Sequence, residues 1–123
     1  MGSLAGRRVL VVEDEILLAM ELEDVLAEAG CKDIATAGTV QAALEQVRRW
    51  RPDGVVLDLN LHGEKSFPVA DALDEAGIPF IIVSGHSRAI VPRRHIERPF
   101  VEKPSDPRHV VRTLWAVMAE RGR

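Results

Sequence analysis

Five residues with charged or reactive side chains come at the end of short apolar runs, or just after them: Glu13, Asp14, Asp58, Ser84 and Lys103. Carboxylates that are crowded together repel one another, and a hard divalent cation held by oxygen ligands relieves that repulsion. Mg²⁺ in proteins is commonly bound by one or two carboxylates, a carbonyl oxygen and water. If the fold brings the acids together, they predict a site for Mg²⁺, or for Mn²⁺, beside a hydroxyl and an ammonium group.

The elements that must position these residues are strands that alternate with helices. Apolar runs predict strands at Arg8–Glu13, Lys32–Thr36, Gly54–Leu59, Ile78–Ser84 and Phe100–Glu102. Segments of helical period predict helices at Glu15–Ala29, from the cap Thr39 to Trp50, at Ser66–Ala76, and from Asp106 onward. This alternation predicts an α/β fold, a doubly wound sheet of five parallel strands in the flavodoxin-like order 2-1-3-4-5.

In an open sheet of this kind, ligands bind beyond the carboxyl ends of the strands, where the strand order reverses. The five residues all fall at such strand ends, so we expect them to share one site. Taken alone, Glu13 and Asp14 are equally well explained as a polar strand end and an acid at a helix N-terminus. An acid that ends a buried strand is costly unless it has partners, which favours a functional role for Asp58.

Residues 85–99 break the regular pattern of strand and helix. Their apolar positions do not keep a helical period across Pro92, so we expect a fourth helix that is short or irregular, in a mobile segment. Among nearby acids, four arginines of this segment face only Glu97, which predicts a basic patch for docking an acidic partner: Arg88, Arg93, Arg94 and Arg98.

Length and composition indicate one globular domain over residues 1–123, with a flexible N-terminus over residues 1–6 and no effector domain. No apolar run reaches the roughly 20 residues of a membrane span, and no signal peptide is recognisable, so we expect a cytoplasmic protein. The single cysteine, Cys31, excludes an internal disulfide. A net charge of -3 argues against direct binding to nucleic acid.

Four motifs stand in sequence at successive strand ends: VLVVEDE, VVLDLNLHG, FIIVSGHS and FVEKP. No single motif is decisive, but together they resemble the receiver domains of two-component response regulators over almost the whole chain. The resemblance implies a domain that accepts a phosphoryl group from a histidine kinase or a histidine phosphotransfer protein. It implies output to a downstream protein through a change of shape, in a phospho-acceptor that catalyses only its own phosphorylation and dephosphorylation.

The resemblance also implies roles for individual residues. Asp58 resembles the phospho-acceptor, and Asp14 and Asp58 resemble metal ligands, with the backbone carbonyl of Asn60 as a third. Glu13 corresponds to a residue that holds a metal-bound water. It stands where many receivers have aspartate, and His62 stands where many have proline, so we expect the loop after Asp58 to follow a different path.

Three further residues correspond to the phosphoryl-binding and switching positions of the family. Lys103 resembles the lysine that pairs with the acceptor carboxylate and then with a phosphoryl oxygen. Ser84 resembles the hydroxyl donor that moves inward on phosphorylation. Phe100, three residues before the lysine, occupies the place of the aromatic residue that then changes rotamer.

Three other functions compete with this interpretation. A pseudo-receiver would use the same fold as a protein-binding module without phosphorylation, and the complete set of acids, hydroxyl and lysine argues against it. A haloacid-dehalogenase-type phosphatase carries its nucleophile in a D-x-D motif on the first strand, which Asp58 does not match. A flavin-binding domain needs a hydroxyl-rich phosphate loop after the first strand, where this chain has acids that would repel phosphate.

Overall fold

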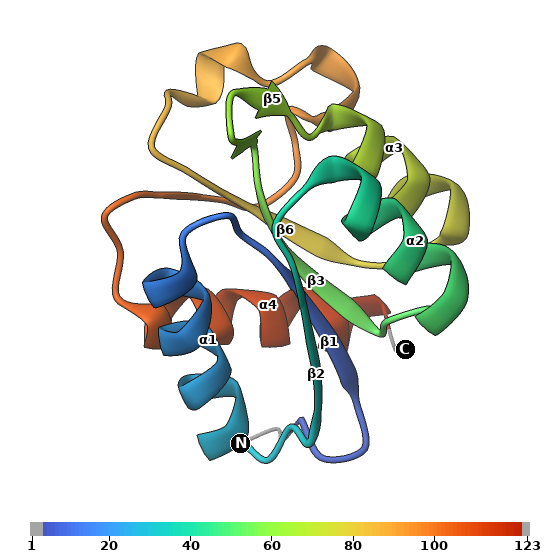
Figure 1. Ribbon diagram of the computed structural model, residues 1–123, viewed down its shortest axis with the longest axis vertical. Coiled ribbons are helices and arrows are strands. Elements are labelled where there is room, and N and C mark those ends of the chain that lie inside the picture. The colour runs from blue at the N-terminus through green and yellow to red at the C-terminus, as the bar shows by residue number, and fades with distance from the viewer. Residues whose placement is uncertain (1–3, 122–123) are drawn as a thin grey trace.

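The computed structural model describes residues 4–121 and has a five-stranded parallel sheet at its centre (Figure 1). The strands lie in the order β2-β1-β3-β6-β7, and every neighbouring pair is parallel. Their bounds are β1 Arg8–Val12, β2 Asp33–Ala37, β3 Gly54–Asp58, β6 Phe80–Ser84 and β7 Phe100–Glu102. This confirms the doubly wound α/β fold and the predicted strand order.

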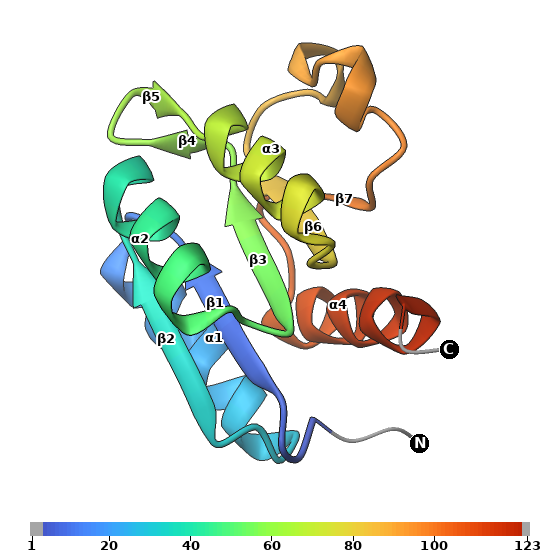
Figure 2. The same cartoon turned by 90° about the vertical axis from the view of Figure 1, so that its right-hand side faces the viewer.

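Helices cover both faces of the sheet (Figure 2). On one face lie α1 and α4, and on the other lie α2 and α3. Their bounds are α1 Ile16–Glu28, α2 Val40–Trp50, α3 Phe67–Ala76 and α4 Pro107–Arg121. The Thr39 hydroxyl accepts a hydrogen bond from the N–H of Ala42 (3.1 Å) and caps α2 as predicted.

Two apolar clusters hold these layers together, one on each face. Because side chains alternate along a strand, Leu10 of β1 enters the cluster under α2 and α3, whereas its neighbour Val11 enters the cluster under α1 and α4. All five residues of β3 and of β6 are buried. In these two strands, polar side chains occur only at the carboxyl ends, where Asp58 and Ser84 lie.

Leu4 lies within residues 1–6, the segment that the sequence predicts to be flexible. Residues 1–3 of the predicted flexible segment lie outside the described residues, but Leu4 is only 1% exposed and packs in the cluster under α1 and α4. Its N–H donates to the carbonyl of Ala29 (3.2 Å). Leu4 is therefore packed in the core, because burial of its apolar side chain is favourable, and the flexibility of the segment stays a prediction.

A two-stranded antiparallel hairpin, which the sequence did not predict, follows β3. It consists of β4 Asn60–Leu61 and β5 Glu64–Lys65, joined by His62 and Gly63. His62 has a φ of 52° and Gly63 a φ of 86°, the positive values that a type I′ turn requires at both central residues. The chain after Asp58 thus forms a defined hairpin.

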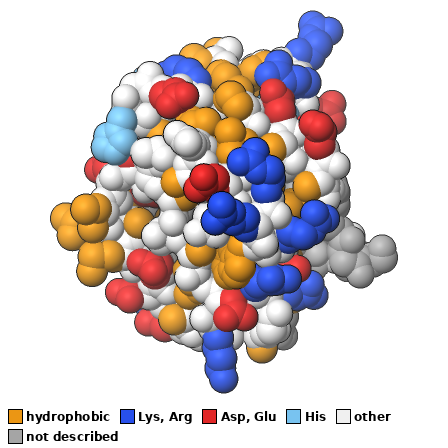
Figure 3. Space-filling model, turned by 45° about the vertical axis from the view of Figure 1, so that its right-hand side comes forward, with side chains coloured by type: hydrophobic (Ala, Val, Ile, Leu, Met, Phe, Trp, Pro, Cys, Tyr) orange, Lys and Arg blue, Asp and Glu red, His pale blue; other side chains and the backbone are white. Residues whose placement is uncertain are grey.

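Between β6 and β7, the described chain forms only two 3₁₀ turns, Arg88–Ile90 and Arg93–His95. This confirms the expectation of a short, irregular fourth helix. Elsewhere, three large hydrophobic side chains at the start of α1 stay exposed: Ile16, Leu17 and Met20. In the space-filling view, hydrophobic side chains project from the left edge of the molecule, and acidic and basic side chains are interspersed over the face that is seen (Figure 3).

Candidate functional site

Three carboxylates meet at the carboxyl end of the sheet. Glu13 directly follows β1 and Asp58 ends β3, and these strands are neighbours, with Val12 paired to Leu57. Glu13, Asp14 and Asp58 each offer an oxygen, and the three oxygens lie within 4.8 Å of one another. Glu13 and Asp58 are buried, at 6% and 5% exposure, whereas Asp14 is half-buried. The strand ends thus bring together the acids that the sequence singled out.

Lys103 lies among these acids. Its Nζ is 2.9 Å from Glu13 Oε1 and 3.0 Å from Asp58 Oδ2. The backbone places it there, because the N–H of Lys103 donates to the carbonyl of Ser84 (2.8 Å) where β7 ends beside β6. Burial acts to lower the pKa of Lys103, but its hydrogen bonds to the two carboxylates outweigh that effect and raise it. Lys103 is therefore held as a cation between two acids.

Glu13 is the acid most disturbed by its surroundings. Burial, together with the negative charge of Asp58, raises its pKa to about 7, although Lys103 acts in the opposite direction. Both of its carboxylate oxygens have partners, since Oε1 contacts Lys103 and Oε2 accepts the N–H of Glu15 (3.2 Å). One ammonium group thus faces two buried carboxylates, and a further cation would lower the energy of the ionised site.

The residues beside Lys103 suit a hard divalent cation. Asp14, Asp58 and Asn60 line one pocket of about 430 Å³. Among the described residues, the side-chain oxygen of Asn60 is buried without a hydrogen-bond partner. Carboxylate and amide or carbonyl oxygens are the ligands that Mg²⁺ accepts. The donor set therefore fits such an ion.

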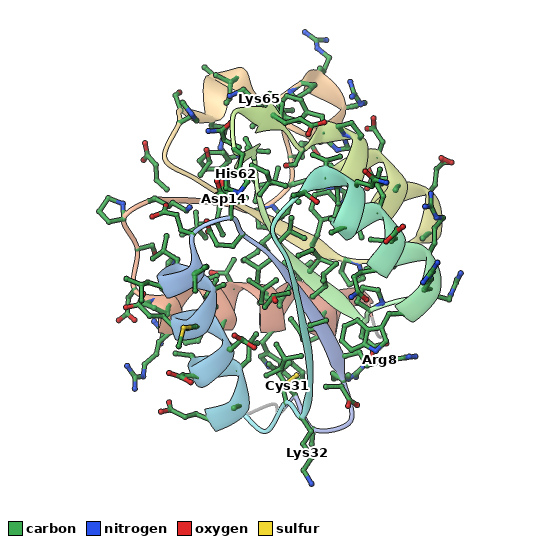
Figure 4. The ribbon with its side chains drawn as sticks, viewed as in Figure 1. Arg8, Asp14, Cys31, Lys32, His62 and Lys65 are labelled. Carbon is green, nitrogen blue, oxygen red and sulfur yellow. The ribbon has the colours of Figure 1, made fainter. Side chains whose placement is uncertain are left out.

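Asp14 is held by the hairpin that follows β3. The N–H of His62 donates to Asp14 Oδ2 (2.9 Å), and the His62 ring Nδ1 lies 3.6 Å from the same oxygen. Figure 4 shows His62 and Asp14 next to each other, far from Cys31 at the opposite end of the sheet. Partial burial acts to raise the pKa of Asp14, but hydrogen bonds, foremost that from His62, lower it below its usual range. The sequence had marked His62 only as a departure from proline.

Ser84 and Phe100 lie on the neighbouring parallel strands β6 and β7, where Ser84 pairs with Glu102 and Phe100 pairs with Ile82. Ser84 is fully buried at the end of β6, one residue beyond the Asp58–Val83 pair, and its hydroxyl accepts the N–H of His86 (3.0 Å). Phe100 is half-buried at the start of β7. The guanidinium of Arg88 lies over its ring, 5.3 Å from the centroid, which is a cation–π contact.

The arginines of residues 85–99 do not face Glu97 alone, and the sequence prediction on this point was wrong. Arg94 donates two hydrogen bonds to Asp71 of α3 (2.7 and 3.1 Å), and Arg98 pairs with Asp74 of the same helix. Between them His95 is 1% exposed, with Nε2 2.7 Å from Asp71 Oδ1 and Nδ1 3.2 Å from Asp74 Oδ2. The partners are more than 20 residues away, so local sequence could not reveal them.

A family comparison agrees with this fold. The family model described as the response regulator receiver domain matches residues 9–114. The chain belongs to the response regulator receiver family of two-component systems. Within residues 4–121, the helices are too short or too polar to cross a membrane.

Two relatives are longer than this chain. The transcriptional regulatory protein PdtaR of Mycobacterium tuberculosis (strain H37Rv) is 31% identical over 83 residues, 67% of this chain and 40% of that protein. The DNA-binding response regulator MtrA of Mycolicibacterium smegmatis is 34% identical over 114 residues, 89% of this chain and 50% of that protein. The chain therefore spans about half or less of the length of these relatives.

Solved structures of similar size share the fold. SdrG from Sphingomonas melonis Fr1 is 39% identical, with a TM-score of 0.79 over 97% of this chain and 99% of that one. The PhyR receiver domain of Erythrobacter litoralis is 29% identical, with a TM-score of 0.80 over 97% and 94%. A CheY-like receiver from Methanospirillum hungatei JF-1 has a TM-score of 0.82 at 18% identity, covering 94% and 96%.

Proposed function

We propose that this receiver accepts a phosphoryl group on Asp58, in a reaction that needs Mg²⁺ or Mn²⁺, and signals to a partner protein by changing shape. One observation carries the proposal: the buried Asp58 carboxylate lies 3.0 Å from Lys103 and shares a pocket with Asp14. A buried acid with a fixed cation partner at the ligand-binding edge of the sheet is suited to chemistry, and not only to packing.

In the proposed reaction, an Asp58 oxygen attacks the phosphorus of a phosphohistidine, the P–N bond breaks, and the histidine leaves with the electron pair. Asp14, Asp58 and the backbone carbonyl of Asn60 would hold the metal ion, with Glu13 acting through a bound water. The ion, when bound, supplies positive charge that offsets charge on the phosphoryl oxygens. Lys103 lies within reach of Asp58 and would donate to one of those oxygens.

Ser84 and Phe100 are the proposed switch. Phosphorylation adds roughly -1.5 to -2 charges and strong hydrogen-bond acceptors at Asp58. The Ser84 hydroxyl accepts the N–H of His86 and so keeps its own O–H to donate to a phosphoryl oxygen. Movement of Ser84 toward the phosphoryl group would pull on the segment that contains Arg88, whose guanidinium lies over the Phe100 ring. The output would then be a rearrangement of β7 and the segment before it.

The proposed partners are proteins in the cytoplasm. A histidine kinase or a histidine phosphotransfer protein would be the phosphoryl donor, as the family resemblance implies. Exposed Ile16 and Leu17, which follow the acidic pair at the start of α1, offer apolar contact area to a protein docked at the site. A net charge of -3 favours a downstream protein over direct contact with nucleic acid.

Intact-mass measurement after incubation with acetyl phosphate and Mg²⁺ tests the proposal. We expect the mass of one phosphoryl group to be added to the wild type, and nothing to be added to Asp58→Asn. Asp53→Asn is the matched control. Asp53 directly precedes the first residue of β3, at the end of the strand away from the site, and its carboxylate accepts the N–H of Arg8. An unlabelled wild type would favour the pseudo-receiver, and a labelled Asp58→Asn variant would refute the choice of Asp58.

A further inference from the structure

The β4–β5 hairpin is firmly attached to the core at its base. The Ser66 N–H donates to the carbonyl of Leu59 (2.9 Å), and the Ser66 hydroxyl donates to the carbonyl of Asp58 (2.6 Å). Ser66 is fully buried and Leu61 is 2% exposed. The hairpin therefore has a fixed position relative to the end of β3.

The tip of the hairpin is fixed by its turn. Leu61 pairs with Glu64, which leaves His62 and Gly63 as a two-residue loop. Both have positive φ values, 52° and 86°, so the turn is of the type that matches the twist of a hairpin. The direction of the His62 N–H is thus set by backbone geometry and does not depend on the imidazole.

Two N–H groups of the hairpin point at carboxylates. The N–H of Asn60 donates to Asp58 Oδ1 (3.2 Å), and that of His62 donates to Asp14 Oδ2 (2.9 Å). Leu61, between these two residues, pairs with Glu64 of β5. The N–H of Asn60 in β4 and that of His62 in the turn therefore each bind one of the two carboxylates that line the pocket.

We propose that the β4–β5 hairpin is a positioning element for the metal site, in which the His62 N–H orients Asp14 while the Asn60 N–H orients Asp58. The inference rests on the proposed function, in which these two acids bind a divalent cation. A hydrogen bond to one oxygen restricts rotation of the Asp14 carboxylate and leaves its other oxygen to bind the ion. A proline at position 62 has no N–H and could not do this.

The effect of such a contact on metal binding can be large. Loss of a hydrogen bond that orients a metal ligand typically weakens metal affinity by about 10- to 100-fold. His62 is thus a positioning residue that acts through Asp14, and its contribution comes from the main chain.

Isothermal titration with Mg²⁺ on two variants separates the N–H from the imidazole. His62→Asn keeps the N–H and tolerates the positive φ, since Asn–Gly is a favoured type I′ pair. We expect its affinity to stay within about twofold of the wild type. His62→Pro removes the donor and cannot adopt the turn, and we expect its affinity to fall by about tenfold or more.

NMR tests the hydrogen bond in the metal-free protein without altering the hairpin. We expect the His62 amide proton to resonate downfield and to move upfield in Asp14→Asn, but not in Asp53→Asn. Wild-type affinity in His62→Pro, or an amide proton that ignores Asp14→Asn, overturns the inference and leaves the proposed function standing. A wild type that binds no Mg²⁺ overturns the proposed function itself, and the positioning role with it.

Discussion

Glu13 and Asp58 share the single ammonium group of Lys103, so the metal-free site has more negative than positive charge when both acids are ionised. The contacts of 2.9 and 3.0 Å leave two buried carboxylates on one cation, with Asp14 close by. Burial raises the pKa of Glu13, and the negative charge of Asp58 raises it further. A proton on Glu13 is one way to neutralise the site, and a bound divalent cation is another.

The first residue-scale prediction concerns pH. The folded protein raises the pKa of Glu13 from 4.5 to about 7, so it binds this proton more tightly than the unfolded chain does. The resulting stabilisation is fully present below pH 4.5 and is lost as the pH rises toward 7. In metal-free buffer, we expect Glu13 to lower the free energy of unfolding over this range by at most about 3 kcal/mol.

Urea denaturation at several pH values measures this effect, with Glu13→Gln as the variant that has no proton to lose. Between pH 4.5 and 7, we expect the free energy of unfolding to fall less steeply with pH in Glu13→Gln than in the wild type. Asp14 does not affect this comparison. Its pKa is lowered, so its contribution to the free energy of unfolding changes only below about pH 4. Identical slopes in the two proteins would show that Glu13 is already ionised at pH 4.5.

At the scale of the elements, regular strands and helices were predictable because their signals are local. Five apolar runs specified the five parallel strands to within two residues at each end, and Thr39 marked the start of α2. Burial of both sheet faces makes such runs continuous, which is why they are easy to recognise. The convergence of Glu13, Asp58 and Lys103 then followed from topology, since parallel strand ends share one edge.

Contacts between distant segments were not predictable in this way. Asp71 and Asp74 lie on α3, and nothing in their own sequence shows that His95 and two arginines will pack against them. The β4–β5 hairpin was missed for a different reason. Its turn begins with His62, whereas the usual signal for a type I′ turn is Asn–Gly or Asp–Gly.

The element-scale prediction concerns the contacts that attach residues 85–99 to α3. Hydrogen bonding from Arg94, aided by His95, lowers the pKa of Asp71, so its ion pair with Arg94 persists at all pH values well above 4. In Asp71→Asn we expect amide exchange at pH 7 to become faster across residues 85–99 and to stay unchanged in β1 and β3. The buried His95 would lose the carboxylate that its Nε2 contacts at 2.7 Å.

Hydrogen–deuterium exchange with mass spectrometry provides the measurement. Glu75→Gln is the matched control, because Glu75 is an exposed acid of the same helix. Faster exchange throughout the protein in Asp71→Asn would mean that the acid supports the whole fold. Unchanged exchange over residues 85–99 would mean that the apolar contacts of Val91, which is 6% exposed, suffice to hold the segment.

At the scale of the whole molecule, residues 85–99 link the candidate site at the end of β6 to the start of β7. The segment begins after Ser84 and ends before Phe100, and the backbone of Ser84 accepts the N–H of Lys103 (2.8 Å). Between these ends, the described chain forms only 3₁₀ turns, which are weaker than α-helix. Its ion pairs to α3 are partly exposed to solvent, so each contributes modestly. A change at Asp58 therefore reaches a segment without an α-helix, which partly exposed ion pairs and the buried side chains of Val91 and His95 hold in place.

We predict that Mg²⁺ with beryllofluoride, a mimic of the phosphoryl group, slows amide exchange across residues 85–99. Ser84 would be drawn toward the mimic, and the shift would be passed through residues 85–87 to Arg88 and to the Phe100 ring beneath it. The buried strands β1 and β3 should keep the same protection in both states, because their side chains fill the two apolar clusters. The change would then be a local ordering of the segment and not a general stabilisation.

Three samples make this test decisive: the wild type with Mg²⁺ alone, the wild type with Mg²⁺ and beryllofluoride, and Asp58→Asn with both. Only the second should show slower exchange over residues 85–99, because the mimic needs the Asp58 carboxylate. Ser84→Ala should bind the mimic but lose most of the effect, since the hydroxyl that couples Asp58 to the segment is gone. Equal protection in all three samples would exclude this segment as the switch and direct attention to the exposed start of α1.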